Sequence, residues 1–154
     1  MVEERRGFSV LHLMIFAAVF LAVLAISVHL MRFKMVSNEN TARESLHVYN
    51  QALFAYLNTY ETYPKALANL GAGPQVGVAS ADLIDPVLAT GKKSGYVFAY
   101  VPGELDFDGT TSAYTITAMP SVAGVTGRLR FTMDETGTVL VVPSGTVAAR
   151  SANP

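Results

Sequence analysis

Apolar side chains dominate the first part of the chain, from Phe8 to Met31. Of these 24 residues 20 are apolar, and no charged residue lies between Gly7 and Met31. A helix of this length extends about 36 Å at about 1.5 Å per residue, and the hydrocarbon core of a bilayer is about 30 Å thick. The segment therefore predicts a membrane-spanning helix. A cleaved secretory signal fits less well, because its apolar region is usually about 7–15 residues long and ends at a small-residue cleavage site.

After this run the pattern changes to a single apolar stripe. Apolar side chains recur every three or four positions from Leu46 to Tyr60, which is the spacing of one face of a helix. No Gly or Pro occurs from the start of the apolar run to Tyr63, and Pro64 then ends the helical pattern. We therefore expect one continuous helix from about Ser9 to Tyr60, whose second half packs on a globular domain.

The last third of the chain has the composition of strands. Four short runs are rich in Tyr, Val, Phe, Thr and Ile, and Asp134-Glu135-Thr136-Gly137 separates the last two as a turn. Three or four antiparallel strands with one apolar face, covered by the stripe of the long helix, make an α+β fold. The predicted strands are Tyr96–Val101, Ala113–Met119, Leu129–Met133 and Thr138–Val142.

Two segments between the helix and the strands carry local signals. We expect a short helical turn at Lys65–Leu70. We also expect a short helix or turn over Ser80–Leu88, with Ser80 as its N-cap. Asp82 and Asp85 lie in the same segment, where capping and solvation explain them better than a catalytic carboxylate pair does.

Composition narrows the function classes. The chain has 154 residues, a formal net charge of -1 and no cysteine. The near-neutral charge argues against nucleic-acid binding, and the lack of cysteine excludes disulfides, thiolate zinc sites and cysteine nucleophiles. The sequence has no G-x-S-x-G or H-E-x-x-H motif, and His12, His29 and His47 all fall on the predicted helix. We therefore expect no enzyme.

One acidic segment is a candidate metal site. Glu104, Asp106, Asp108 and Gly109 lie in the string G-E-L-D-F-D-G. D-x-D-G resembles the start of a calcium loop, in which hard oxygen ligands gather beside a glycine that permits a tight turn. No acidic residue completes an EF-hand downstream, and a solvated turn explains the same residues. Calcium at Asp106 and Asp108 is one hypothesis, and no other cofactor is expected.

The amino-terminal string R-R-G-F-S-V-L-H-L-M-I-F, together with the apolar run that follows, resembles the class III signal of type IV pilins and type II secretion pseudopilins. In that family a prepilin peptidase on the cytoplasmic side cuts after the glycine of a basic leader and methylates the new N-terminal Phe. The resemblance implies cleavage between Gly7 and Phe8, with Phe8 as the mature N-terminus, and a pilin-like fold. The alternative is an ordinary signal anchor that begins in the same way.

His12 departs from the family pattern. The family nearly always has Glu as the fifth residue after the cleavage point, where its carboxylate is thought to neutralise the N-terminal amine of a neighbouring subunit. Histidine supplies no fixed negative charge, and its neutral form is the less costly one in lipid. His12 is compatible with a tip or minor subunit, with a lineage in which His accepts a hydrogen bond from the amine, and with impaired assembly.

The resemblance implies a structural subunit of a type IV pilus-like or type II secretion filament. Its partners are then other copies of itself, the prepilin peptidase, an inner-membrane assembly platform with its ATPase, and membrane lipid. The subunit is expected to span the bacterial inner membrane once, with its globular domain outside the cytoplasm, before it joins a periplasmic or cell-surface filament. A membrane-anchored binding domain that does not polymerise is the alternative. The expected parts are a leader (1–7), a membrane or filament-core helix (8–31), an amphipathic helix (32–62), a globular region (63–145) and a flexible tail (146–154).

Overall fold

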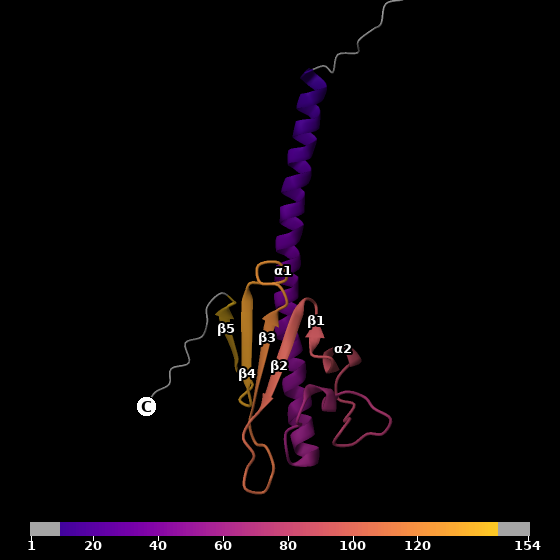
Figure 1. Cartoon of the computed structure of the whole chain (residues 1–154), viewed down its shortest axis with the longest axis vertical. Helices are drawn as coiled ribbons and strands as arrows, with labels where there is room; N and C mark the ends of the chain where they lie inside the picture. The colour runs from indigo at the N-terminus through magenta and orange to yellow at the C-terminus, as the bar shows by residue number, and fades with distance from the viewer. Residues whose placement is uncertain (1–9, 145–154) are drawn as a thin grey trace, which may run out of the picture. The chain divides into compact units, whose positions relative to one another are not determined.

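The computed structural model describes residues 10–144 of the chain. The chain divides into two compact units, Met1–Lys34 and Met35–Pro154, and we call the second the globular unit. The leader at residues 1–7, the predicted processing site at Gly7 and Phe8 and the predicted tail at 146–154 lie outside the described residues. The elements, drawn in Figure 1, are α1 (Val10–Tyr60), the 3₁₀ helix η1 (Leu67–Leu70), α2 (Pro86–Ala89), β1 (Lys92–Lys93), β2 (Tyr96–Pro102), β3 (Tyr114–Pro120), β4 (Leu129–Asp134) and β5 (Val139–Pro143).

The predicted long helix is confirmed over the described residues, and it ends at Tyr60 as expected. The next residue, Glu61, adopts a positive φ of 59°, and its N–H donates to the carbonyl of Leu57 at 2.8 Å. This bond satisfies one of the carbonyls left free in the last turn of the helix. Pro64 follows three residues later, and its missing N–H prevents any continuation of the helix.

The predicted apolar stripe of α1 is buried, and it begins earlier than the sequence pattern indicated. Leu46, Tyr49 and Leu53 are completely buried, and Leu57 and Tyr60 pack partly buried against the same core. Met35 and Ala42, which precede Leu46 on the helix, are also buried, as is Tyr56. Small or separated side chains such as these do not stand out in a hydrophobic pattern, so the true start of the buried face was not visible in the sequence.

The sheet confirms the predicted α+β arrangement and adds one strand. Its order is β1-β2-β3-β4-β5, and every neighbouring pair is antiparallel. The four predicted strands appear with their ends shifted by about one residue. The additional strand, β1, is only Lys92–Lys93, and two lysines carry no alternating pattern. Positive φ angles at Ser94 and Gly95 (48° and 72°) make the tight hairpin turn that joins it to β2.

One face of the sheet supplies seven of the 19 buried residues of the core, and α1 covers it (Figure 1). Alternate residues along β2, β3 and β4 point to this face, as the two-residue period of a strand requires. The buried members are Tyr96, Phe98, Tyr114, Ile116, Ala118, Phe131 and Met133.

The segment between α1 and the sheet corrects one prediction. Ser80 is not an N-cap, because it forms an isolated bridge with Gly77, with N–H to carbonyl distances of 3.0 Å in both directions. The short helix α2 begins later, and its N-cap is Asp85, whose carboxylate accepts the N–H of Leu88 at 2.9 Å. The turn predicted at Lys65–Leu70 is the 3₁₀ helix η1, which occupies the last four of these residues.

Candidate functional site

The apolar part of α1 is the first candidate site. Residues 10–27 and 29–34 are all exposed within the chain. Large side chains such as Phe16, Phe20 and Ile26 are more than half exposed. The helix is long and apolar enough to cross a membrane, and none of its most apolar stretch is buried by the rest of the chain. Exposed apolar surface of this size is typical of a site that contacts lipid or other protein.

His12 lies in the first turns of this helix, and its side chain is exposed among apolar neighbours. Gly7 and Phe8, the predicted processing residues, lie outside the described residues. His29 lies 17 positions beyond His12, so about 26 Å of helix separates the two. The two imidazoles of one chain therefore cannot share a ligand.

The acidic segment predicted as a calcium site forms the loop between β2 and β3. A turn closes within it, because the Gly109 N–H donates to the Asp106 carbonyl at 2.9 Å, and the Asp106 N–H donates to the Thr110 carbonyl at 2.8 Å. Asp108 is used inside the loop. Its Oδ1 accepts both the N–H and the hydroxyl of Thr110, at 3.0 and 2.6 Å, and these bonds lower the pKa of the carboxyl.

Within residues 10–144 no three Asp, Glu, His or Cys side chains come close enough together to hold a metal ion. Asp106 and Asp108 therefore lack a third ligand from the described part of the chain. Glu104 belongs to the same loop and does not complete such a group. Calcium binding at this loop stays a prediction.

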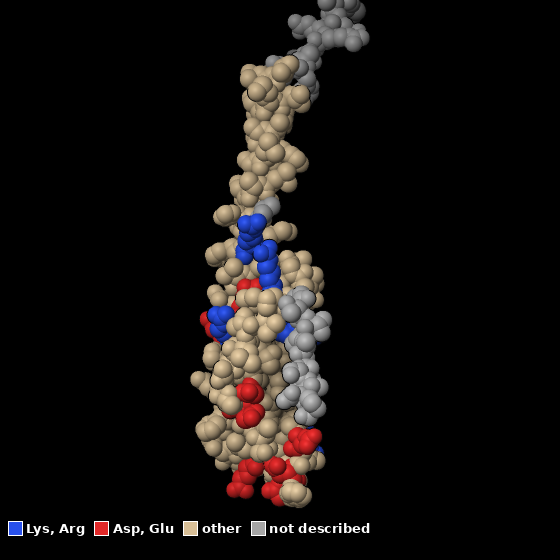
Figure 2. All heavy atoms as spheres, turned by 90° about the vertical axis from the view of Figure 1, so that its left-hand side faces the viewer, with Lys and Arg blue, Asp and Glu red and all other residues tan. Residues whose placement is uncertain are grey.

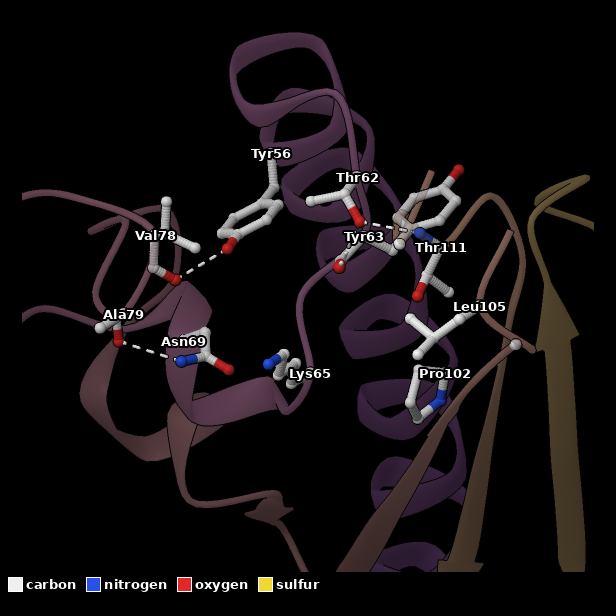
Figure 3. A pocket seen from close by; sticks show the side chains of 12 residues that line it. Tyr56, Thr62, Tyr63, Lys65, Asn69, Val78, Ala79, Pro102, Leu105 and Thr111 are labelled. Atoms are coloured by element: carbon white, nitrogen blue, oxygen red, sulfur yellow. Dashed lines mark hydrogen bonds between the residues drawn. The ribbon is translucent and has the colours of Figure 1, made fainter. Parts of the chain in front are cut away.

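A cavity of about 570 Å³ is the second candidate site (Figure 3). It opens between the end of α1, the segment around η1 and the β2–β3 loop. Apolar side chains form most of its lining, and Lys65 supplies its cation. The residues that line it are Tyr56, Thr62, Tyr63, Lys65, Asn69, Val78, Ala79, Pro102, Gly103, Leu105, Gly109 and Thr111.

Hydrogen bonds fix the walls of this cavity. The Tyr56 hydroxyl donates to the Val78 carbonyl at 2.7 Å, and the Asn69 amide donates to the Ala79 carbonyl at 3.2 Å (Figure 3). On the opposite wall the Thr111 N–H donates to the Thr62 hydroxyl at 2.9 Å. The lining contains no His, Asp, Glu or Cys. It therefore offers space and one positive charge, and no pair of groups for general acid–base chemistry.

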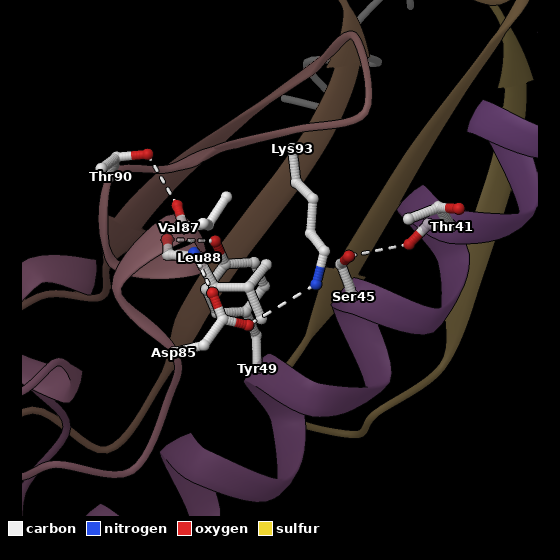
Figure 4. Close-up of polar contacts among 8 residues, drawn as sticks. All are labelled: Thr41, Ser45, Tyr49, Asp85, Val87, Leu88, Thr90 and Lys93. Atoms are coloured by element: carbon white, nitrogen blue, oxygen red, sulfur yellow. Dashed lines mark hydrogen bonds and ion pairs between the residues drawn. The ribbon is translucent and has the colours of Figure 1, made fainter.

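A polar cluster joins α2 to α1 (Figure 4). The Tyr49 hydroxyl donates to the Leu88 carbonyl at 2.6 Å, while Asp85 caps the same helix and pairs with Lys93 at 3.5 Å. Burial, and secondarily the charge of Asp85, raises the pKa of Tyr49. The Leu88 N–H is the main cause that lowers the pKa of Asp85. Every polar group here has a structural partner, so the cluster stabilises the fold and is not a reactive site.

The sequence did not predict the cavity. Its lining comes from four separate stretches of the chain, and no local motif marks them as neighbours. In the sequence, Lys65 is only a charged residue after the long helix and Tyr56 is only an aromatic residue on that helix. Neither residue indicates a cavity. Comparison of the chain with models of protein families, with curated proteins and with solved structures gives no match.

Proposed function

We propose that this chain is a structural subunit of a membrane-assembled filament of the type IV pilin or pseudopilin kind. The observation that carries the proposal is the exposed apolar stretch of α1, which continues as one helix into a stretch packed on the chain's own sheet. Residues 10–27 and 29–31 carry no charge and are exposed, and exposed apolar surface of this size is typical of a site that contacts lipid or other protein. The Arg5-Arg6-Gly7-Phe8 junction supports the same function by resemblance.

The physical basis of assembly lies in this helix. In a bilayer, a helix satisfies all its backbone hydrogen bonds internally, so the apolar part of α1 is stable in lipid without a partner. Transfer into a bundle of identical helices exchanges lipid contacts for helix contacts and exposes little apolar surface to water. The globular units then remain outside the bundle. An ATPase and an inner-membrane platform supply the work of extraction, and they act from the cytoplasmic side in this proposal.

Processing at the amino terminus tests the proposal directly. We expect intact-mass analysis of the protein from its native host to show a mature chain that begins at Phe8 and carries a methyl group on its amine. Substitution of Gly7 by a bulky residue, Gly7→Leu, should leave the leader attached. Circular dichroism is the control, and a spectrum like that of the unaltered chain shows that the variant keeps its helix and sheet. A native chain that retains Met1–Gly7 and stays monomeric in the membrane contradicts the proposal.

The cavity favours a second candidate function. Its volume of about 570 Å³ falls within the usual range of about 300–1,000 Å³ for small-molecule sites, and its lining is mainly apolar. A membrane-anchored binding domain explains it without polymerisation. Native mass spectrometry of the chain purified from its host separates the two candidates. A co-purified ligand on a monomer favours the binding domain, and filaments without ligand favour the subunit.

A further inference from the structure

The antiparallel sheet places alternate loops at opposite ends of the globular unit. The β2–β3 loop lies at the end where α1 stops, because the Tyr63 N–H donates to the Thr111 carbonyl at 2.9 Å. The β3–β4 loop lies at the other end, where the Asn38 amide donates to the Thr126 carbonyl at 2.9 Å. We call these the distal end and the proximal end.

The distal end is acidic and carries exposed apolar side chains. In the β2–β3 loop Leu105 is 69% exposed and Phe107 is fully exposed. Acidic side chains gather at this end of the unit in Figure 2. They come from the β2–β3 loop, the β4–β5 turn and the residue after α1, and they are Glu61, Glu104, Asp106, Asp108, Asp134 and Glu135. Lys65 is a cation close to this end, because it lines the cavity together with Leu105 and Gly109 of the β2–β3 loop.

The proximal end offers the complementary surface. In the β3–β4 loop Val122 and Val125 are 53% and 63% exposed, and the side chain of Arg128 is exposed beside them. Lys92 lies at the same end of the sheet, since it pairs with Val97, which pairs in turn with Met119. One carboxylate is also present, because Glu39 accepts the backbone N–H of Arg128 at 2.6 Å.

These charges are not neutralised inside the unit. Within residues 10–144 the structure has one ion pair, between Lys93 and Asp85. The carboxylates of Glu104 and Asp106 and the cations of Lys92 and Arg128 therefore remain available to a partner. An exposed aromatic beside acidic side chains at one end matches exposed valines beside basic side chains at the other.

We propose that the distal end of one copy docks on the proximal end of a second copy, with the β2–β3 loop against the β3–β4 loop. The proposal rests on the proposed function, because it describes how the globular units of successive subunits meet. A contact between two different surfaces of the same chain is heterologous, and it propagates into a helical filament when the rotation between successive copies does not close into a ring. The opposite charges select this head-to-tail orientation over head-to-head contact, which brings like charges together.

Cysteine cross-linking tests the contact, and the native chain has no cysteine that interferes. Two full-length single variants, Phe107→Cys and Val125→Cys with different tags, are expressed together in the native host and oxidised with copper phenanthroline. We expect a disulfide between the two differently tagged chains, and little between identical ones. Ala99→Cys, exposed in the middle of β2, is the matched control and should cross-link to neither.

Charge reversal tests whether the opposite charges of the two ends select the head-to-tail contact. Asp106 makes its recorded hydrogen bonds through its backbone only, so Asp106→Lys should leave the loop intact. We expect Asp106→Lys or Arg128→Glu alone to lower the cross-linked fraction about two- to fivefold, the usual range for an exposed charge pair. The double variant Asp106→Lys/Arg128→Glu should restore it.

Electron microscopy of filaments sheared from the same cells separates this proposal from the proposed function. Filaments together with the mixed disulfide support both. Filaments without the mixed disulfide, with disulfides mainly between identical variants, or without rescue by the double variant overturn the docking surface and leave the filament function standing. Absence of filaments from cells that make the unaltered chain overturns both.

Discussion

Tyrosine hydroxyls join separate segments of the globular unit through hydrogen bonds to the backbone. Four tyrosines donate to backbone carbonyls in other parts of the chain, at distances of 2.6–2.8 Å. Each ring adds apolar area to the core while its hydroxyl donates to a main-chain carbonyl. The donors and acceptors are Tyr49 to Leu88, Tyr56 to Val78, Tyr96 to Leu129 and Tyr100 to Pro64. The sequence contained no signal for these partners, which are main-chain carbonyls in α2, in β4 and in the segment between α1 and α2.

The buried tyrosines predict an alkaline limit to stability. Burial raises the pKa of Tyr49, Tyr100 and Tyr114, and it raises the pKa of Tyr96 to about 12. An unfolded chain loses these protons near pH 10, where the folded chain still holds them. Stability is therefore fully present below about pH 10 and falls as the pH rises from there through the folded pKa values. We expect the thermal midpoint, followed by circular dichroism, to drop steeply above about pH 10.

Tyr96→Phe is the control for this pH dependence. It removes one titrating phenol, and with it the hydrogen bond to the Leu129 carbonyl. The lost bond lowers the midpoint by a similar amount at all pH values, whereas the lost titration makes the slope above about pH 10 shallower. A midpoint that is constant from about pH 8 to about pH 11.5 in the unaltered chain contradicts the assignment.

At the scale of elements, α1 shows which buried positions a hydrophobic pattern can predict and which it cannot. The spacing of Leu46, Tyr49 and Leu53 predicted a packed face, because residues three and four apart share one side of a helix. The pattern did not extend to Met35 and Ala42, whose burial depends on which loops of the sheet region reach that part of the helix. The strand β1 was missed for a different reason: it consists of two lysines, and its pairing with the neighbouring β2, not its side-chain type, makes it a strand.

Neighbouring positions on α1 provide a matched test of this face. Leu53 is completely buried, whereas the next residue, Phe54, is 60% exposed. We expect Leu53→Ala to lower the free energy of unfolding of the globular unit by about 2–5 kcal/mol, because it leaves a cavity in the core. Phe54→Ala should change it by less than about 0.5 kcal/mol. Urea unfolding of the full chain in detergent, followed by tyrosine fluorescence, measures both, and equal losses contradict the packing described above.

At the scale of the whole molecule, the chain combines an exposed apolar stretch of helix with a unit that has its own core. The globular unit buries aromatic and aliphatic side chains from α1, the connecting segment and the sheet in one cluster. The apolar stretch of α1 contributes nothing to that cluster. The two parts therefore have separate sources of stability, which is what a subunit requires if its helix is to leave the membrane while its globular unit remains folded.

His12 lies in the apolar stretch of α1, and the proposed assembly gives it a role in contact between subunits. If its imidazole accepts a hydrogen bond from the amine of a neighbouring subunit, His12→Ala should shorten filaments, because the amine loses its acceptor. His12→Glu should preserve or lengthen them, because a carboxylate attracts the charged amine directly. Filament length in electron micrographs of cells that make each variant measures the effect. If both variants assemble like the unaltered chain, the partner-amine role of His12 is wrong.

The sequence alone determined the elements whose signals are local. An uninterrupted apolar run and the absence of Gly and Pro predict a long helix, and alternating or β-branched runs separated by turn residues predict strands. Tertiary structure decided what depends on residues far apart in the chain: the cavity, the buried positions before Leu46 and the placement of opposite charges at the two ends of the unit. These features arise when the folded chain brings distant segments together. The pattern of apolar and polar residues along the sequence does not show which distant segments will be in contact.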